Sequence, residues 1–594
     1  MARRRALFAV LVACAGLGSL ALMAWALSSG GWSVADMVAL AAFMVVVPWL
    51  AVGFANGLIG LMLEWFSRDK LRAVNPMMTE LDDSALDEPV RTSTAILLCI
   101  RNESTPRLVR NLQVLARGLL ARADARQFHF YVLSDTTDAH RALEEEQAFG
   151  ALARQWQPEL ALTYRRREHN TGYKAGNIQD FCAEFGARHE LALVLDADSV
   201  MSANALRRLA LTMQANPNMG ILQGLVVGLP AASAFTRLFQ FGMRLGMRSF
   251  TLGSAWWQGD CGPFWGHNAM IRIAPFAQHC QLPELKGRAG QTQAILSHDQ
   301  IEAVLMRRAG YEVRVYPLED ESFEENPPNV IEFVARDLRW CAGNLQYTKL
   351  LTLPGLKATS RVQLVLAILM FAGAPAWLTL LGAMGWSVHQ SSLAQAFHLP
   401  ALAWAFGCVA TMVALPRLAS ALVVLFRGSQ RRRFGGGFRF VVSFVLEQIF
   451  SMLLVPAMWV SQTLLMMGLP FGRRMVWGSQ NRDAAHVSWG QAARAFGLHT
   501  LLGLALGWLW IDVQAPQTWW VSYFLAGLWL SVPLAVVTAR PWLGRVMVRA
   551  QLAAVPEEFT QTAFLVDRRR LAELTDTAVV NATAPSTPSF EPGR

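Results

Sequence analysis

Apolar positions form long runs toward both ends of the chain and short runs between them. Two long runs, Ala6–Leu27 and Val34–Trp65, come first, and each reaches the ~20 apolar residues that a membrane span needs. From residue 93 to about residue 360 no run is long enough to span. Long runs then resume at Val362–Trp386, Pro400–Phe426, Phe438–Leu469, Leu498–Ile511 and Trp519–Val537.

The central stretch alternates short apolar strands with amphipathic helices. A helix capped by Asn102 or Ser104 follows the first strand. Alternation of this kind indicates an α/β domain with a parallel sheet, wound in a Rossmann-like manner. The strands are predicted at 93–100, 127–134, 160–165 and 191–195.

These patterns divide the chain into five parts. The linker, residues 73–92, is polar and contains Pro76 and Pro89. The tail is rich in Ala, Thr, Pro and Ser beyond about Thr575, so its end is predicted to be disordered. The parts are two N-terminal transmembrane helices (1–72), the linker (73–92), a soluble domain (93–360), a C-terminal transmembrane bundle (361–540) and a tail (541–594).

Basic residues assign the two sides of the membrane. Arg3–Arg5 and Arg68–Arg72 flank the first two runs, which puts the N-terminus and the soluble domain in the cytoplasm. The first run could instead be a secretory signal, because Ala24-Trp-Ala26 resembles a cleavage site, but its length favours an uncleaved span.

The run Phe438–Leu469 begins and ends beside basic segments, so it must cross the membrane twice or not at all. We favour two short crossings that turn near Pro456, which gives eight spans over the whole chain. The alternatives are seven spans, or a segment that lies along the membrane interface.

Composition supports a membrane protein. Hydrophobic residues make up 53% of the 594 residues and charged residues only 16%. The net charge of +10 lies largely beside apolar runs, which suits an anionic membrane surface and shows no nucleic-acid footprint. The seven cysteines are scattered without a C-x-x-C pair, so neither a disulfide framework nor a zinc site is predicted.

The stretch from Leu191 to Ser199 carries the strongest candidate chemistry. Asp196 and Asp198 stand two apart at the end of a buried strand, where open α/β sheets bind ligands. Two hard oxygen ligands suit a divalent cation that also holds substrate phosphates. The alternative is a helix N-cap, because a helical pattern follows Ser199.

Two further positions suggest a nucleotide site. Asp135 ends the second strand, where a carboxylate can accept hydrogen bonds from a base or a ribose; the alternative is a turn or cap residue. Lys174 begins Lys-Ala-Gly-Asn177 after the basic run Arg165–Arg167 and can meet phosphate as a point charge; the alternative is a solvated basic loop.

Two segments suggest a sugar site. Trp265-Gly-His-Asn-Ala269 is aromatic and polar without being charged, although His267 could equally be a core histidine. Arg336, Arg339 and Trp340 share one helix face, where arginine can hold a diphosphate and tryptophan can support a sugar ring. The alternative for these three residues is a basic helix at the membrane surface.

Asp299 has two conflicting interpretations. Ser297-x-x-Gln300 matches a capping box, which puts Asp299 in the first turn of a helix, where the dipole favours a carboxylate. Glycosyl transfer to a sugar hydroxyl needs a general base, and Asp is a usual choice. Because the dipole would lower the pKa of Asp299, a base needs neighbours that raise it, such as Glu302 or the phosphates of a donor.

In this order, the motifs resemble the membrane-embedded processive members of glycosyltransferase family 2, which include cellulose synthase. The match is closer to one branch, whose members synthesise osmoregulated periplasmic glucans at the bacterial inner membrane. The resemblance covers about Thr92 to Phe559. Its segments include Val-Leu-Asp-Ala-Asp-Ser-Val-Met201, Phe-Trp-Gly-His-Asn-Ala-Met270, Arg-Trp-Cys-Ala-Gly-Asn344, Trp477–Asp483 and Pro556-Glu-Glu-Phe559.

The resemblance implies a GT-A, Rossmann-like α/β cytoplasmic domain of the nucleotide-sugar type inserted in an all-α multi-span membrane domain. It further implies that Asp135 contacts the uracil or ribose of UDP-glucose. Asp196 and Asp198 would hold the nucleotide and Mg²⁺ or Mn²⁺, and Asp299 would be the general base. Lys174 and His267 would bind substrate.

The resemblance assigns Arg339 and Trp340 to the diphosphate and the acceptor end. The wider family usually has Gln at the position of Arg336, whereas the glucan branch has Arg there, as this chain does. The first strand ends in Ile-Arg-Asn-Glu103, where that branch more often has Cys-Asn-Glu-Asp. Either Glu103 alone would make the contact of this segment to uracil, or that contact would be looser.

The predicted protein is an inverting, processive glucosyltransferase of the bacterial inner membrane that builds a mainly β-1,2-linked glucan and passes it to the periplasm. Its partners would be UDP-glucose, the growing glucan, membrane lipids and periplasmic glucan-processing proteins, without nucleic acid. The alternatives are another processive synthase and a non-catalytic membrane sensor that binds nucleotide sugar. The full set of carboxylates argues against the sensor.

Overall fold

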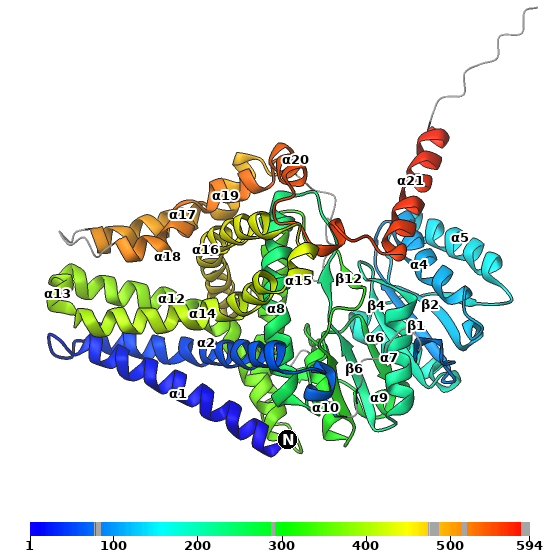
Figure 1. The fold of residues 1–594 in the computed structure, drawn as a ribbon, viewed down its shortest axis with the longest axis horizontal. Coiled ribbons are helices and arrows are strands. Elements are labelled where there is room, and N and C mark those ends of the chain that lie inside the picture. Colours follow the sequence, from blue (N-terminus) through cyan, green and yellow to red (C-terminus); the bar gives the residue numbers. More distant parts are fainter. Residues whose placement is uncertain are drawn as a thin grey trace, which may run out of the picture.

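A computed structural model of the chain combines a bundle of long helices with an α/β domain (Figure 1). The structure describes residues 1–76, 78, 85–286, 292–472, 475, 486–511 and 519–583. Much of the predicted linker, the Trp477–Asp483 motif and the end of the tail lie outside these residues.

The core of the α/β domain is a seven-stranded sheet in the order β11-β6-β8-β4-β1-β2-β3. The first four strands of the sequence pair in parallel, as predicted. β8 is antiparallel to both β4 and β6, so the sheet is mixed and the prediction of a parallel sheet is wrong at this position. The strands are β1 (Thr94–Ile100), β2 (Phe128–Ser134), β3 (Ala161–Arg166), β4 (Leu191–Asp196), β6 (Met219–Gly224), β8 (Ala269–Arg272) and β11 (Glu312–Tyr316).

Helices cover both faces of this sheet because side chains alternate along each strand. Ile96 and Leu98 of β1 pack on one face with α4, α5 and α7, whereas Ala95 and Leu97 pack on the other with α6, α9 and α10. The helices are α4 (Thr105–Leu120), α5 (Ala139–Trp156), α6 (Tyr173–Glu184), α7 (Ala203–Ala215), α9 (Ile273–His279) and α10 (Asp299–Arg308).

Two small sheets lie beside the main one. β12 (Ser322–Glu324) pairs with β5 (Val200–Met201) and β7 (Val227–Gly228), close to the carboxyl end of β4. β9 (Leu285–Lys286) pairs with β10 (Thr292–Gln293).

Six helices of the described chain are long and apolar enough to cross a membrane. A seventh span is formed if α18 and α19, bent by 61° against each other, are counted as one. Each predicted apolar run is thus helical, but the prediction of eight spans is wrong. The helices are α1 (Ala2–Leu27), α2 (Val34–Phe66), α12 (Ala358–Gln390), α14 (Leu399–Phe426), α16 (Gly437–Gly468), α17 (Trp489–Ile511), α18 (Trp519–Trp529) and α19 (Ser531–Thr538).

α16 is one unbroken helix that includes Pro456, so the predicted turn at that proline does not exist. Near its start, Ser443 accepts a hydrogen bond from the Ala553 backbone N–H; near its end, Gln462 donates to Asp337 of the α/β domain. These contacts are about 29 Å apart along the helix at 1.5 Å per residue. Between these two contacts α16 also packs on α8 (Ala234–Gln258) of the α/β domain, so it lies across that domain.

Two helices of the α/β domain contact the membrane bundle. α8 (Ala234–Gln258) packs on α2, where Gly60 and Gly253 allow the two backbones to come close. α11 (Val330–Leu345) packs against α12 and α16, and buries Cys341 beside Leu465. Figure 1 shows α8 between the bundle and the sheet.

The C-terminal segment returns to the α/β domain. Glu557 and Glu558 pair with Arg244 and Arg237 of α8. α21 (Ala563–Thr583) packs on α4, and it continues past Thr575, so the predicted disorder does not begin there. The remaining short helices are α3 (Lys70–Val74), α13 (Leu393–Ala396), α15 (Gly428–Arg433) and α20 (Pro541–Ala550).

Candidate active site

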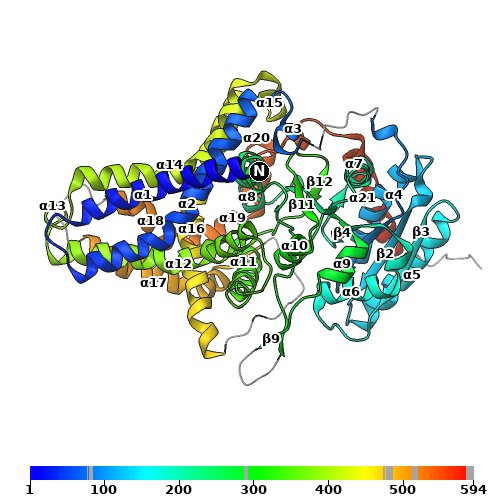
Figure 2. The same ribbon diagram turned by 90° about the horizontal axis from the view of Figure 1, so that it is seen from below.

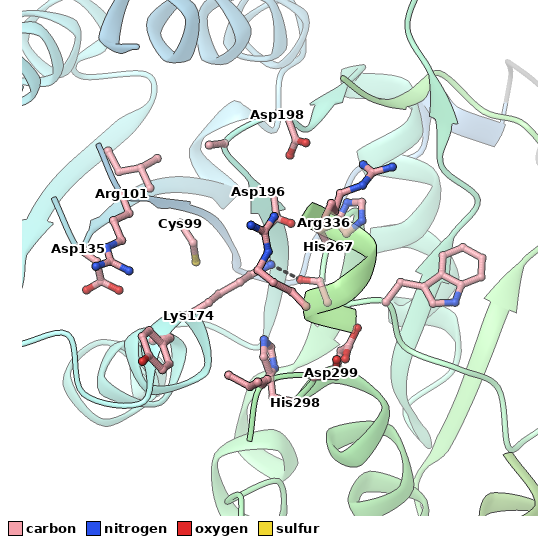
Figure 3. Close-up of a pocket in the computed structure, with 18 of the residues that line it drawn as sticks. Cys99, Arg101, Asp135, Lys174, Asp196, Asp198, His267, His298, Asp299 and Arg336 are labelled. Carbon is pink, nitrogen blue, oxygen red and sulfur yellow. Dashed lines mark hydrogen bonds and ion pairs between the residues drawn. The ribbon is translucent and has the colours of Figure 1, made fainter. Parts of the chain in front are cut away.

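A cavity of about 210 Å³ opens at the carboxyl ends of β1, β2 and β4. The strand register explains the position, because Cys99 of β1 pairs with Asp196 of β4 and Ile100 pairs with Ser134 of β2. Figure 3 shows charged side chains from several segments converging there. All nine predicted site residues line this cavity: Asp135, Lys174, Asp196, Asp198, His267, Asp299, Arg336, Arg339 and Trp340.

Asp196 and Asp198 lie at the carboxyl end of β4. The Lys174 ammonium group binds the Asp196 carboxylate and also donates to the Gly266 carbonyl at 2.5 Å. Asp198 is buried at 7% exposure and still lines the cavity. It does not cap a helix, because Ser202 caps α7 by accepting from the Ala205 N–H.

No group of three or more His, Cys, Asp and Glu side chains among the described residues is placed to hold a metal ion by itself. Asp196 and Asp198 offer at most two carboxylates on this side of the cavity. That donor set fits a hard cation such as Mg²⁺, which usually binds one or two carboxylates, water and substrate phosphates. A cation here would therefore depend on a bound phosphate compound.

Asp135 is held by a buried arginine. Arg167 donates from Nε and Nη2 to the two carboxylate oxygens of Asp135, at 2.7 and 2.8 Å. Asp135 is not the helix cap of the alternative interpretation, because Asp138 caps α5. Burial disfavours the Arg167 charge, but its bonds to Asp135 and Asp180 outweigh burial and raise the pKa of Arg167.

The loop Trp265–Asn268 forms another wall of the cavity. Gln223 accepts from the Trp265 N–H at 2.7 Å and donates to the His267 carbonyl at 2.9 Å, which fixes the loop. Gly266 has φ +80°, and a Cβ there would lie 3.3 Å from Cβ of Asp299. Glycine thus lets the loop approach Asp299. His267 lines the cavity and is not a fully buried core histidine.

Asp299 is the first residue of α10, as predicted, but the capping box does not form. His298 occupies the N-cap position, and Ser297 packs against Gly343 of α11. Burial raises the pKa of the Asp299 carboxyl, and Glu302 adds to this. His298, the Gln300 N–H and Lys174 oppose the rise, yet the net direction is upward, toward the range of a general base.

α11 brings two arginines and a tryptophan to the wall of the cavity. The Arg336 guanidinium lies 4.9 Å from the centre of the Trp340 ring, a cation–π contact. Arg336 and Arg339 are buried at 6% and 9% exposure, whereas Trp340 is 43% exposed. Two buried cations with an exposed aromatic ring can bind a diphosphate beside a sugar.

Several cavity residues lie outside the predicted set. Cys99 and Arg101 lie at the end of β1, which neighbours β2 and β4, so strand order could have indicated both. Glu103, which the resemblance named for a contact to uracil, also lines the cavity. Tyr173 adjoins Lys174, whereas Glu324 at the end of β12 carries no sequence signal. His298 also lines the cavity and pairs with Glu302, and their i,i+4 spacing in the predicted helix could have indicated this pair.

Comparison with known proteins identifies related sequences over nearly the whole chain. The family described as Glycosyl transferase family group 2 matches residues 191–416. A glucans biosynthesis glucosyltransferase H from Xylella fastidiosa is 32% identical, over 92% of this chain and 86% of the relative. One from Rhodopseudomonas palustris is 34% identical, over 96% of this chain and 79% of the relative. One from Pseudomonas paraeruginosa is 34% identical, over 88% of this chain and 61% of the relative.

Solved structures give weaker likenesses. A mannosyltransferase from Pyrobaculum calidifontis in complex with GDP-Man and Mn²⁺ has a TM-score of 0.39 at 16% identity, over 64% of this chain and 99% of its own. A mannosyl-3-phosphoglycerate synthase from Rubrobacter xylanophilus has a TM-score of 0.29 at 14% identity, over 48% and 83%.

Proposed function

Because this chain belongs to the glucans biosynthesis glucosyltransferase H family, within glycosyltransferase family 2, we propose that it transfers glucose from UDP-glucose to a growing, mainly β-1,2-linked glucan. Membership makes it a membrane-embedded glycosyltransferase of glucan synthesis. The donor, the linkage, processivity and the residue roles are our proposals.

One observation carries this proposal. Carboxylates from three separate segments, Asp135, Asp198 and Asp299, meet in one cavity with the cations Lys174 and Arg339. Such a set offers acceptors for a nucleoside, charge for a diphosphate and a base for a hydroxyl group.

The donor would lie with its nucleoside toward Asp135. The carboxylate held by Arg167 would accept hydrogen bonds from ribose or uracil, and Glu103, shortly after β1, also lines the cavity. Lys174 then lies next to the diphosphate. Asp198, together with Asp196, would hold Mg²⁺ or Mn²⁺, which would neutralise charge on the departing diphosphate.

Transfer would proceed by in-line displacement. Asp299 accepts the proton of the attacking glucan hydroxyl group as its oxygen bonds to the anomeric carbon of glucose. The bond from that carbon to the diphosphate oxygen breaks, UDP leaves, and the anomeric configuration inverts. Arg336 and Arg339 stabilise the charge on UDP, and Trp340 supports the acceptor end. His267 would contact the sugar.

Contacts near the helix ends support a proposal for the sidedness of the protein. Arg5 of α1 pairs with Asp260 of the α/β domain, and Arg427 after α14 binds the Glu64 carbonyl of α2. Glu557, after α19, pairs with α8. These ends lie on one side, which we propose to be the cytoplasm because they are basic. With α16 across the domain, the chain crosses six times, and the glucan leaves between the crossings.

Asp299→Asn tests the proposal. In detergent-purified full-length protein given radiolabelled UDP-glucose and Mg²⁺, we expect UDP release to fall by roughly 10²–10⁴-fold, the usual contribution of a general base. UDP binding should persist, because Asn keeps the shape of the side chain. Asp87→Asn, in an exposed carboxylate outside the cavity, is the control.

Linkage analysis of the wild-type product tests the proposed β-1,2 linkage. Turnover by Asp299→Asn at the wild-type rate would refute the base assignment. A product without β-1,2 bonds would refute the linkage and leave the base assignment standing.

A further inference from the structure

A buried histidine–glutamate pair lies directly beside Asp299. His298 Nδ1 is 2.8 Å from Glu302 Oε2, one turn along α10. The side chain of His298 is 13% exposed and lines the cavity, whereas that of Glu302 is fully buried at 0%. Figure 3 shows His298 at the wall of the cavity, beside Asp299 and below Lys174.

Glu302 depends on this contact. Its second oxygen, Oε1, is buried without a hydrogen-bond partner in the described structure. Around it lie Cys280, whose thiol donates to the Glu302 backbone carbonyl at 3.4 Å, and the buried Cys182 and Tyr347. A buried carboxylate without a cation is costly, so the imidazole of His298 is its counter-ion.

Three charged side chains face His298: Glu302 and Asp299 from its own helix and Lys174 from α6. Burial alone would lower the pKa of His298, and Lys174 acts in the same direction. The attraction of the two carboxylates outweighs both effects and raises the pKa of His298. Tyr347, from the turn Gln346–Lys349, faces Asp299 and Glu302.

Asp299 therefore has a cation on one side and a second carboxylate one helical turn away. A neighbouring cation favours the ionised form of a carboxyl group, and burial and a like charge disfavour it. Without His298, Asp299 and Glu302 would be two buried acids opposed only by Lys174.

We propose that His298, with its charge held by Glu302, is a positioning residue that keeps Asp299 ionised and able to accept the proton of the glucan hydroxyl group. The proposal rests on the proposed function, because that function makes Asp299 the base. It assigns His298 and Glu302 a part in the reaction beyond folding α10.

The first test compares His298→Gln with His298→Lys, which keeps a cation opposite Glu302. We measure kcat and KM for UDP-glucose against pH in the purified full-length protein. In His298→Gln the acidic limb of the kcat–pH profile should move up by about one pH unit, because Asp299 loses the neighbouring cation of His298. At alkaline pH kcat should return to within about threefold of wild type, with KM unchanged.

His298→Lys should restore the limb to its wild-type position. A purely structural role predicts an equal loss of kcat at every pH with no movement of the limb. Either that result or an equal movement of the limb in His298→Lys would overturn the proposal.

The second test needs no turnover. Diethyl pyrocarbonate modifies neutral imidazole, so the pH dependence of modification, followed on the His298 peptide by mass spectrometry, reports when His298 loses its proton. Glu302→Gln should shift this profile down by about one pH unit. An unmoved profile would refute the Glu302–His298 charge pair.

The two tests separate the two hypotheses. If wild-type protein releases no UDP from UDP-glucose while the modification profile shifts, the proposed function fails and the charge pair stands. If UDP is released but neither profile moves, the proposed function stands and the role of His298 is refuted.

Discussion

At the scale of the residue, the site is built from side chains that fix one another before any ligand is bound. Arg167 holds Asp135 through two bonds, and Lys174 joins Asp196 to the Gly266 carbonyl. Arg167 also pairs with Asp180, so both cations are held at the rim of the sheet. Side chains already held in place lose less freedom when a ligand arrives, so the donor is bound at a smaller entropic cost.

Arg167→Ala tests this positioning. Removing one partner of a buried ion pair costs about 3–5 kcal/mol, part of which falls on donor binding. We expect KM for UDP-glucose, and Kd for UDP, to rise by at least about tenfold while kcat stays within about threefold of wild type. Arg154→Ala, an exposed arginine on α5, is the control. An unchanged Kd for UDP would show that Asp135 does not contact the nucleoside.

Asp135, Asp196 and Asp198 could be predicted to lie together because they follow strand ends, which meet at one edge of a sheet. Arg336, Arg339 and Trp340 could be grouped because they share a helix face. Lys174, His267 and Asp299 were predicted from short motifs and from the family resemblance. The sequence could not identify which side chains hold them. The pairs Arg167–Asp135 and Lys174–Asp196 join residues that are 32 and 22 positions apart. Only the sheet order brings these residues together, and His298–Glu302 competes locally with a capping box that the structure does not form.

At the scale of the element, α11 joins the cavity to the bundle. Its Arg336 and Trp340 line the cavity, while Asp337 on another face accepts a hydrogen bond of 2.7 Å from Gln462 of α16. Long apolar runs predicted most membrane helices to within a few residues of their ends, because length and hydropathy suffice for that, but α17 begins at Trp489, well before the predicted Leu498. They could not show that α16 lies across the α/β domain, since its partners Ala553 and Asp337 are distant in sequence.

Asp337 predicts how the α11–α16 junction responds to pH. Burial raises the pKa of Asp337 to about 6 from an ordinary value of 3.8, against smaller opposing effects of Gln462 and Arg336. The folded protein therefore binds this proton more tightly than the unfolded chain, so the contribution to stability is lost as pH rises through 6. Asp337→Asn, which stays neutral and can still accept from Gln462, should remove that loss.

We expect Asp337→Asn to raise the thermal unfolding midpoint at pH 8 by about 3 °C and to change it little at pH 4.5. Tryptophan fluorescence of the detergent-solubilised protein during heating measures the midpoint. Glu146→Gln, in an exposed side chain of α5, is the matched control. The same shift at both pH values would mean that the effect of the substitution is not electrostatic.

At the scale of the whole molecule, α8 lies between the sheet and the bundle in both views (Figures 1 and 2), and α16 packs on α8 from the bundle side, where it also contacts α12 and α18. Glu447 of α16 lies against Gly242 of α8, and Phe450 packs edge-on against Phe235 of the same helix. We propose that α16, held on α8 in this way, does not cross the membrane, although it is as long and apolar as a span. A helix that does not cross would leave basic segments on one side of the membrane at both of its ends, as the charges of the flanking loops require.

Labelling of single cysteines in a cysteine-free background decides the path of α16. Phe438, near its start, is 83% exposed and Phe471, just beyond its end, is 89% exposed. We expect a membrane-impermeant maleimide to label Phe438→Cys and Phe471→Cys in inverted vesicles and neither in intact spheroplasts. Ser391→Cys, exposed between α12 and α13, should show the opposite pattern. Labelling of Phe438→Cys and Phe471→Cys from opposite sides would mean that α16 crosses the membrane once and that the count of six crossings is wrong.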